Sequence, residues 1–277
     1  MVNSAPSSQD NTADNIAHDQ LPLAGSRILA IARAIIPPIF GMIIVLFAWQ
    51  IIVWTGAWPL YVVPAPLDVA ERVFSDATLY SGLRVTALEV IIGFGLAVCV
   101  GVPLAILVTT SRLLSSIFMP LILLTQSIPK VALAPVLVVA LGYGLATQVT
   151  VVFLVCFFPL IVDTATGLRS ASPDLLDMAR QLSATRWQVL RKILFPGALP
   201  YILSGAKVAI TLAVIGAVIG EFVGSSSGLG FQLLTATARF DGAKAFAAIV
   251  VLSAMSLVLY GIVGALEKIL VPWHGRA

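Results

Sequence analysis

Charge, cysteine and histidine are all scarce in this sequence of 277 residues. Asp, Glu, Lys and Arg together make up 10% of it, whereas hydrophobic residues make up 59%, a balance that ordinary water-soluble domains do not show. The formal net charge is only +3, and the charged residues lie between apolar runs, as they do at the ends of membrane spans. The composition therefore argues against a soluble domain and against nucleic acid as a partner.

The residue types that usually carry chemistry are missing or isolated. Cys99 and Cys156 lie in separate apolar runs and form no CxxC pair, so neither a disulfide framework nor a thiolate metal site is expected. His18 and His274 are the two histidines, each near one end of the chain, and no HExxH motif occurs. No Gly-x-x-x-x-Gly-Lys-Ser/Thr loop is present to cradle a nucleotide. We expect no catalytic residues, no metal site and no cofactor, and therefore a protein that is not an enzyme.

What the sequence does have is long apolar runs. About 20 apolar residues suffice for a helix to cross a bilayer core, and the breaks between runs predict six spans, at about residues 35–54, 87–109, 114–141, 148–165, 202–223 and 245–266. The Pro37–Pro38 pair falls near the start of the first span. Pro120, Pro129 and Pro135 interrupt the third span, which predicts a kinked or broken helix there. The expected fold class is an all-α, polytopic membrane protein.

Domain limits and orientation follow from the polar residues. Residues 1–26 are rich in Ser, Asn and Asp and predict a disordered cytosolic tail, followed by one transmembrane domain over residues 27–277. Basic residues near span ends are retained in the cytoplasm. With the N-terminus inside, the outer side holds four basic residues, Arg72, Arg84, Arg239 and Lys244. The cytoplasmic side holds ten, namely Arg27, Arg33, Arg112, Arg169, Arg180, Arg186, Arg191, Lys192, Lys268 and Arg276. We expect a cell inner membrane protein with both termini in the cytoplasm.

The longest polar interruption, about residues 169–199, predicts two short helices on the cytoplasmic side. Ser172 is a candidate cap for the first, with Pro173 at its first position, and Thr185 with Gln188 has the spacing of a capping box for the second. One face of the first helix is apolar, made of Leu175, Met178, Ala179 and Leu182. Such a helix suits a groove on a partner protein or the lipid headgroups, and the spacing alone does not choose between them.

The same segment resembles a known motif. Asp177-Met-Ala-Arg-Gln-Leu-Ser-Ala, followed by Ile193-Leu-Phe-Pro196, resembles the cytoplasmic EAA loop of binding-protein-dependent ABC permeases. The resemblance implies that this loop docks on a separate ATPase subunit through Asp177, Met178, Ala179, Leu182, Ser183, Ile193 and Pro196. Asp177 stands where the family usually has Glu. Ser183 replaces the usual Gly, so the turn between the helices lacks the residue that best tolerates positive φ.

Further motifs extend the resemblance from about residue 60 to the end. They are Val63-Pro-Ala-Pro, Gly93-Phe-Gly-Leu-Ala, Gly101-Val-Pro-Leu, Ile128-Pro-Lys-Val-Ala-Leu-Ala-Pro and Glu221-Phe-Val-Gly-Ser-Ser-Ser-Gly-Leu-Gly. Their order is similar to that in the nitrate/sulfonate/taurine branch. This resemblance implies a type I ABC importer permease fold, two ATPase copies that bind the ATP, a second and identical permease copy, surrounding membrane lipids, and a periplasmic or lipid-anchored solute-binding protein.

The transported solute stays open at this point. The resemblance implies a small polar or anionic nutrient, of the nitrate, sulfonate, taurine or bicarbonate kind. The alternative within the family is a neutral heterocycle such as a thiamine-pyrimidine precursor or riboflavin. From another class, a stand-alone secondary transporter or channel is the competing hypothesis.

A few residues are candidates for the pathway or its gate: Lys130, Gly216, Gly220 and Glu221. Lys130 lies between two prolines of the broken third span, where irregular backbone faces protein or a water-filled cavity. Gly216 and Gly220 belong to a stripe of small residues, which serves a gate or plain helix packing within the subunit. Glu89, Asp163, Lys207 and Glu221 lie near span ends and are expected to snorkel to the membrane surface.

Overall fold

The structure, a computed structural model, describes residues 24–273, and every regular element in that range is helical. The chain divides after Ala57 into two units. The described element of the first unit is helix α1 (Ala24–Trp54), of which the part Ile36–Trp54 is long and apolar enough to cross a membrane. Pro37 and Pro38 lie near the start of this apolar span, as expected, although the helix itself begins earlier, at Ala24.

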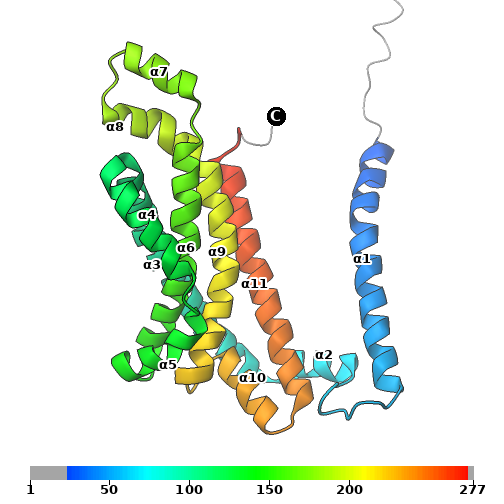
Figure 1. Cartoon of the computed structure of the whole chain (residues 1–277). Helices are drawn as coiled ribbons and strands as arrows, with labels where there is room; N and C mark the ends of the chain where they lie inside the picture. The colour runs from blue at the N-terminus through cyan, green and yellow to red at the C-terminus, as the bar shows by residue number, and fades with distance from the viewer. Residues whose placement is uncertain (1–23, 274–277) are drawn as a thin grey trace, which may run out of the picture. The chain divides into compact units, whose positions relative to one another are not determined.

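The second unit contains the remaining helices (Figure 1). They are α2 (Pro66–Ser75), α3 (Ala77–Thr110), α4 (Arg112–Gln126), α5 (Lys130–Leu141), α6 (Leu145–Arg169), α7 (Pro173–Gln181), α8 (Arg186–Val189), the π-helix η1 (Leu190–Leu194), α9 (Phe195–Gly224), α10 (Leu229–Ala238) and α11 (Gly242–Leu270). The run α8, η1 and α9 is continuous over Arg186–Gly224, 39 residues. The all-α prediction is confirmed.

Within residues 24–273, five helices are long and apolar enough to cross a membrane: α1, α3, α6, the α8–α9 run and α11. The predicted third span is instead two shorter helices, α4 and α5, separated at residues 127–129. The break falls where Pro129 lacks the N–H that would continue the helix, so the predicted interruption is confirmed. Other helices extend beyond their predicted spans. For example, α3 and α11 begin at the N-caps Asp76 and Asp241, which lie before the predicted apolar spans.

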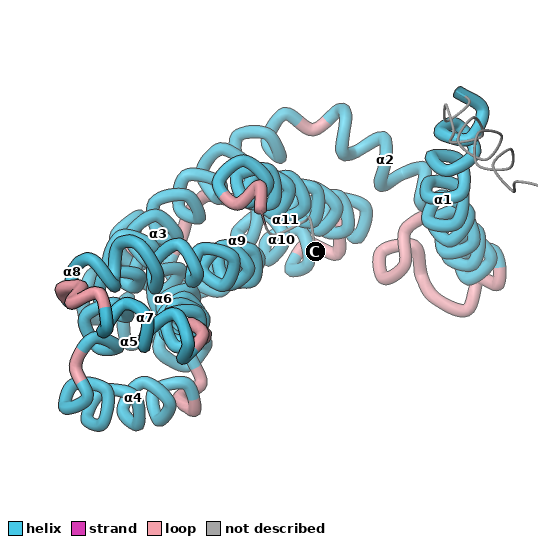
Figure 2. The backbone as a smooth tube through the Cα atoms, turned by 90° about the horizontal axis from the view of Figure 1, so that it is seen from above, coloured by secondary structure: helices cyan, strands magenta, loops and turns pink. Residues whose placement is uncertain are grey.

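Small residues hold the centre of the second unit together. Helix α6 packs on both α3 and α9, and α9 also packs on α11, an arrangement that Figure 2 shows along the helix axes. The buried contacts are rich in alanine and glycine; Ala97, Ala209 and Ala213 are fully buried. Small side chains let helix backbones approach closely and make van der Waals contacts. In lipid these contacts hold helices together, because the hydrophobic effect gives no driving force between them.

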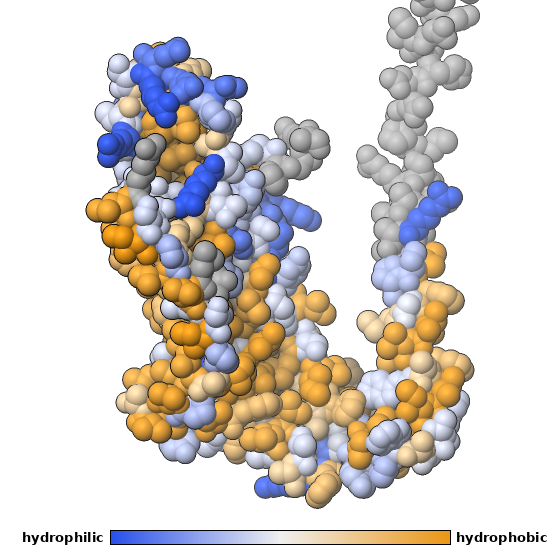
Figure 3. Space-filling model, in the orientation of Figure 1, coloured by the Kyte–Doolittle hydropathy of each residue, from blue (hydrophilic) through white to orange (hydrophobic). Residues whose placement is uncertain are grey.

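The two ends of the helix bundle differ. The loop with α7 and α8 extends from one end, whereas α2, α5 and α10 lie at the other (Figure 1). Figure 3 shows apolar residues over the flanks of the long helices and hydrophilic residues gathered around α7 and α8. The helix α10 was not predicted, since its 10 residues are too few to form a span.

The close contact between α3 and α6 predicts unequal effects of two neighbouring glycines. A Cβ at Gly93 would collide with the side chain of Val152, whereas a Cβ at Gly95 would meet nothing within 4 Å. We expect Gly93→Ala to destabilise the protein by about 1–3 kcal/mol through overpacking. Gly95→Ala, on the same helix, is the matched control and should be neutral or stabilising. Thermal unfolding in detergent measures both; equal melting temperatures would contradict the packing.

Candidate functional site

The helix α7 begins with a proline. Pro173 stands in its first turn with Asp174, as expected, but the Ser172 side chain makes no capping hydrogen bond, so that part of the prediction is wrong. The fixed φ of proline and its missing N–H suit a helix start by themselves. At the second helix the predicted capping box is confirmed: Thr185 Oγ1 accepts from Gln188 N at 3.3 Å, and Gln188 Oε1 accepts from Thr185 N at 2.8 Å.

The turn after α7 depends on a serine with positive φ. Ser183 has φ of 54°, and its N–H donates to Arg180 O at 3.0 Å while Ala184 N donates to Ala179 O at 2.9 Å. These two bonds form a Schellman motif, whose left-handed position is usually glycine. Ser183 therefore takes the same backbone conformation that the usual glycine would take, at a steric cost that glycine avoids.

The apolar face of α7 is largely uncovered. Ala179 is buried against the rest of the chain, but Leu175, Met178 and Leu182 are 45%, 50% and 74% exposed. Trp187 on α8 is also 66% exposed. On the polar side Asp177 and Arg180 form an exposed ion pair with 2.5 Å between Oδ1 and Nη1. A patch of large apolar side chains at a polar end of a protein is typical of an interaction surface.

The helices beyond this loop connect it to the membrane part. Ile193 lies in the π-helix η1 and Pro196 in the first turn of α9, and both are half-buried. Pro196 lacks a backbone N–H, and the π-helical turn η1 lies directly before the turn that contains it. The loop is thus joined without a break to the long helix α9.

At the opposite end, Glu221 of α9 binds the start of α10. Its Oε2 accepts hydrogen bonds from the backbone N–H groups of Gly230 and Phe231, and its Oε1 accepts from Thr86 Oγ1 at 2.6 Å. A carboxylate at a helix N-terminus satisfies free N–H groups and the helix dipole. Gly228, with φ of +101°, leaves room for it, because a Cβ there would overlap the carboxylate. This contact explains why the motif carries Glu221 with Gly228 and Gly230.

Glu89 lies beside this contact. It is 2% exposed and Glu221 is 1% exposed, so the prediction that these two snorkel to the surface is wrong. Glu221 is held there by the hydrogen bonds described above. Lys207 also stays within the protein, because its Nζ binds Glu267 Oε2 at 2.7 Å. Burial with a partner replaces the snorkelling that residue position alone had suggested.

Two candidate pathway positions have clear surroundings. Lys130 begins α5, directly after the break, and its Nζ lies 5.2 Å from the centre of the Phe158 ring, a cation–π distance. Gly216 and Gly220 lie where α9 crosses α6, so that a Cβ at either would lie 3.1–3.2 Å from the Cα of Val152 or Gln148. These glycines contact α6 of the same chain, and their role as a gate stays a prediction.

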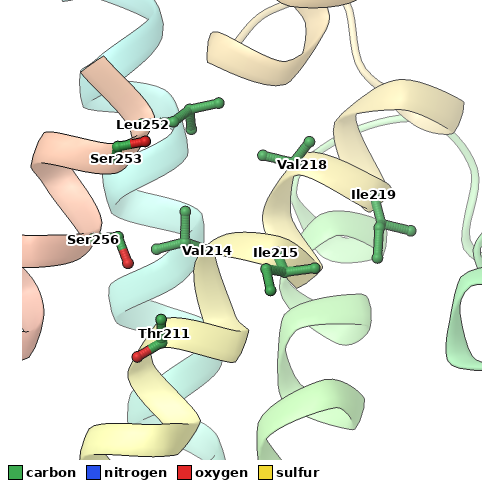
Figure 4. A pocket seen from close by; sticks show the side chains of 8 residues that line it. All are labelled: Thr211, Val214, Ile215, Val218, Ile219, Leu252, Ser253 and Ser256. Carbon is green, nitrogen blue, oxygen red and sulfur yellow. The ribbon is translucent and has the colours of Figure 1, made fainter. Parts of the chain in front are cut away.

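Several hollows lie on the second unit. The groove between α9 and α11, of about 300 Å³, is mainly apolar; Figure 4 shows Ser253 and Ser256 on α11 facing the branched side chains of α9. A second groove, of about 770 Å³, lies beside Trp187 and the end of α3. A third, of about 430 Å³, is lined by Glu89, Gln148 and the connection after α9. None of these described hollows groups three metal-ligating side chains.

Residues 224–228 read Gly-Ser-Ser-Ser-Gly and fit the letters of the GxSxG motif of hydrolases. That motif places its serine on a sharp turn between a strand and a helix, with a histidine as base. Here the segment follows the helix α9, and both histidines of the chain lie outside the described residues. The geometry therefore does not suit a serine nucleophile.

A membrane bundle with a protruding amphipathic loop is the arrangement that the comparisons also indicate. Residues 97–271 match the family model described as "Binding-protein-dependent transport system inner membrane component". The chain belongs to this family. It is therefore the permease subunit of an ABC importer, a multi-pass inner membrane protein, and not an enzyme; the family works with an ATPase and a solute-binding protein.

The relatives cover nearly the whole permease. A probable ABC transporter permease of Haemophilus influenzae is 36% identical over 82% of this chain and 93% of its own length. The formylaminopyrimidine transport permease ThiX of Halalkalibacterium halodurans is 32% identical, covering 88% and 98%. The riboflavin permease RibX of Chloroflexus aurantiacus is 34% identical, covering 86% and 89%. The taurine permease TauC of Escherichia coli, at 28% over 89% and 92%, supports the branch that the sequence predicted.

The fold matches as well. An inward-facing structure of the MetNI methionine ABC transporter is similar with a TM-score of 0.63, over 70% of this chain and 96% of that chain, at 19% identity. At this identity the similarity shows the fold alone. It confirms the predicted type I importer permease fold.

Sequence reasoning missed several polar contacts at this end of the helix bundle. Thr86 also accepts from Leu229 N at 2.9 Å, and Gln148 Nε2 donates to Gly224 O at 2.8 Å. Gln232 reaches across to α3 through Thr78 O. The position of Thr86, one helical turn before Glu89, could have been read from the sequence. The contacts of Gln148 and Gln232 could not, because they depend on how the helices pack.

The turn at Ser183 predicts an order of three variants. Ser183→Gly removes the steric cost of positive φ, while Ser183→Val increases it, because a β-branched residue tolerates that conformation least. Glycine removes the steric cost but loses more chain entropy on folding, so we expect a net stabilisation of about 0.5–1 kcal/mol. We expect valine to destabilise the turn by at least as much. Hydrogen exchange of the Ala184 amide measures the change. Equal exchange in all three would contradict the Schellman geometry.

The N-terminal end of α3 predicts a pH dependence. The hydrogen bond from Thr78, and then Lys244 at 3.0 Å, lower the pKa of Asp76 from its ordinary 3.8 to about 2, although burial opposes the shift. A lowered pKa stabilises the folded state above pH 3.8, and this contribution is lost as pH falls toward 2. We expect Asp76→Asn to destabilise the protein by about 1 kcal/mol at pH 7, allowing for solvent screening. The melting temperatures of wild type and Asp76→Asn should converge as the pH is lowered from 7 to 2. A difference in melting temperature that stays constant over this range would contradict the account.

Proposed function

We propose that two copies of this permease form one translocation pathway, driven by two ATPase subunits that dock on the 169–199 loop and supplied by a solute-binding protein at the opposite end. The loop faces the cytoplasm and both termini lie inside. ATP is bound by the ATPase subunits, and the permease itself holds no cofactor. The binding protein is periplasmic or lipid-anchored.

The observation that carries this proposal is the uncovered apolar face of α7. Met178 and Leu182 are exposed at the end of the molecule with the hydrophilic residues (Figure 3). An amphipathic helix with such a face fits a groove on a partner protein. Asp177 and Arg180 flank that face and supply polar contacts around it, as the rim of a protein interface does.

The distribution of basic residues supports the orientation. Described residues of the α7 end include Arg169, Arg180, Arg186, Arg191, Lys192 and Lys268. The other end has Arg72, Arg84, Arg239 and Lys244, of which Arg72 and Lys244 are paired with Asp241 and Asp76. Basic residues near span ends are retained in the cytoplasm, and their excess at the α7 end supports an orientation with that end inside. Arg27 lies in α1, but its side chain and the residue Arg276 lie outside the described part.

The pathway lies between the two copies and opens by movement of the helices nearest the break. Lys130, at the start of α5, is the residue that we place beside the solute. Gly216 and Gly220 allow α9 to slide on α6, and Glu221 holds the outer end of α9 to α10. A homodimer is the simplest assembly, because one chain has the helices of half a pathway.

The solute is a small polar molecule, and two classes have support. Lys130 favours an anion of the sulfonate or taurine kind, because its ammonium group begins the helix after the break. The names of two relatives above 30% identity, for formylaminopyrimidine and riboflavin, favour a neutral heterocycle. Both classes are consistent with one permease fold, since the binding protein selects the solute.

The docking hypothesis predicts that a charge on the apolar face of α7 disrupts the complex. We expect Leu182→Asp to lose most of the co-purified ATPase, because one buried charge without a partner weakens binding by about 3 kcal/mol, or more than a hundredfold. Gln181→Asp adds the same charge one residue earlier, at an exposed polar position, and is the control.

Both variants are compared after affinity purification from membranes, with the amount of inserted permease held equal. The expected result is ATPase recovered with wild type and with Gln181→Asp but not with Leu182→Asp. Recovery with all three would show that α7 is not the docking helix. No ATPase with any of them would overturn the proposed assembly.

A further inference from the structure

We propose that the groove beside Trp187 binds one anionic phospholipid of the surrounding bilayer, with the headgroup phosphate on Arg186 and Arg191 and an acyl chain along its apolar wall. The groove, of about 770 Å³, lies between the end of α3, at residues 103–110, and the start of the α8–α9 run. Its volume lies in the range of sites that hold a small ligand. The docking proposed for α7 does not use it.

A π-helical turn makes one wall of the groove continuous. Phe195 N donates to Leu190 O, five residues earlier, whereas residues five apart in a regular α-helix lie about 140° apart around the axis. The wider turn brings Phe195 onto the face that carries Arg186 and Leu190, which are four residues apart. Trp187 and Arg191, also four residues apart, form a second row, and all five residues line the groove.

The two arginines of the groove have no acidic partner. Neither Arg186 nor Arg191 forms an ion pair with a carboxylate of the described residues, and both side chains are exposed. At the same end of the bundle, Arg180 is paired with Asp177. The guanidinium group presents a planar fork of N–H donors that matches the oxygens of a phosphate. The groove therefore offers two cationic groups that the chain itself does not neutralise.

The place of the groove along the helices suits a lipid. Thr110 is the last residue of α3, and α8, which begins at Arg186, lies beside α7 at the same end of the bundle (Figure 1). From Thr110 back to Pro103 the wall runs about 10 Å along α3, away from that end. Leu107 on this wall is 57% exposed. Trp187 is 66% exposed, and tryptophan is typical of the level where headgroups meet acyl chains.

These features together select an anionic phospholipid. A soluble anion would contact the arginines but leave the apolar wall uncovered. A zwitterionic lipid carries its own cation beside the phosphate, which opposes the charge of the two arginines. An anionic phospholipid supplies both a negative headgroup and an apolar chain. Basic pockets between transmembrane helices near a membrane surface are typical binding sites for such headgroups.

The test is lipid binding to the full-length permease, purified in detergent with the subunits that accompany it and measured by native mass spectrometry. The probes are dioleoyl phosphatidylglycerol, which is anionic, and dioleoyl phosphatidylcholine, which is zwitterionic. We expect wild type to bind one phosphatidylglycerol per permease more tightly than phosphatidylcholine. Arg186→Gln and Arg191→Gln should each weaken phosphatidylglycerol binding about fivefold, the usual contribution of one basic residue near an anionic lipid surface.

Lys192→Gln is the matched control, because Lys192 is exposed, follows Arg191 directly and does not line the groove. This variant loses the same charge and should bind phosphatidylglycerol as wild type does. Leu107→Gln keeps both arginines but makes the apolar wall polar, so it should also weaken binding. An excess of inorganic phosphate should not displace the lipid.

Three results would overturn the inference. Equal affinity for the two lipids, or an equal loss in Lys192→Gln and Arg191→Gln, would show a general attraction between charges and no site. Full displacement by inorganic phosphate would show a site for a soluble anion. Loss of the ATPase in Arg186→Gln and Arg191→Gln, with lipid affinity unchanged, would show that the groove belongs to a protein interface.

Discussion

The carboxylate of Glu221 is the group on which the end of the helix bundle opposite α7 depends. A charge inside the membrane domain must be met by protein groups, and here the backbone of α10 and the hydroxyl of Thr86 meet it. That requirement fixes where α10 begins, forces glycine at 228, and brings α3 against α9. One buried carboxylate thus determines a helix start and a helix contact.

The same helix connects that contact to the docking loop. From Arg186 to Gly224 the chain is helical without a break, a length of about 58 Å at 1.5 Å per residue. A partner that moves α8 therefore acts on the rigid element that carries Gly216, Gly220 and Glu221. The π-helical turn and Pro196 at the start of α9 are the places where this element bends most easily. Under the proposed docking at α7, this continuity connects the ATPase to the opposite end of the helix bundle.

Local rules predicted the parts of this structure that local physics decides. Apolar runs located the long helices, Pro129 located the break, and the capping box at Thr185 was found from spacing alone. The misses have one cause. Glu89 and Glu221 were placed by their distance from span ends, but Glu221 is held in a buried position by Thr86, which is 135 residues away in sequence, and by the start of α10. Serine is unusual at the left-handed position of a helix-ending turn, so the sequence did not predict this turn at Ser183. Two backbone hydrogen bonds nevertheless hold the turn in that conformation.

The central claim is that this chain is a pathway whose energy comes from another polypeptide. Reconstitution in liposomes tests it most directly, with uptake and ATP hydrolysis measured for the permease alone and for the permease with its ATPase and binding protein. The account predicts no hydrolysis and no uptake by the permease alone, and uptake that requires ATP in the full assembly. Uptake by the permease alone, independent of ATP, would contradict the account and would identify the chain as a self-sufficient transporter.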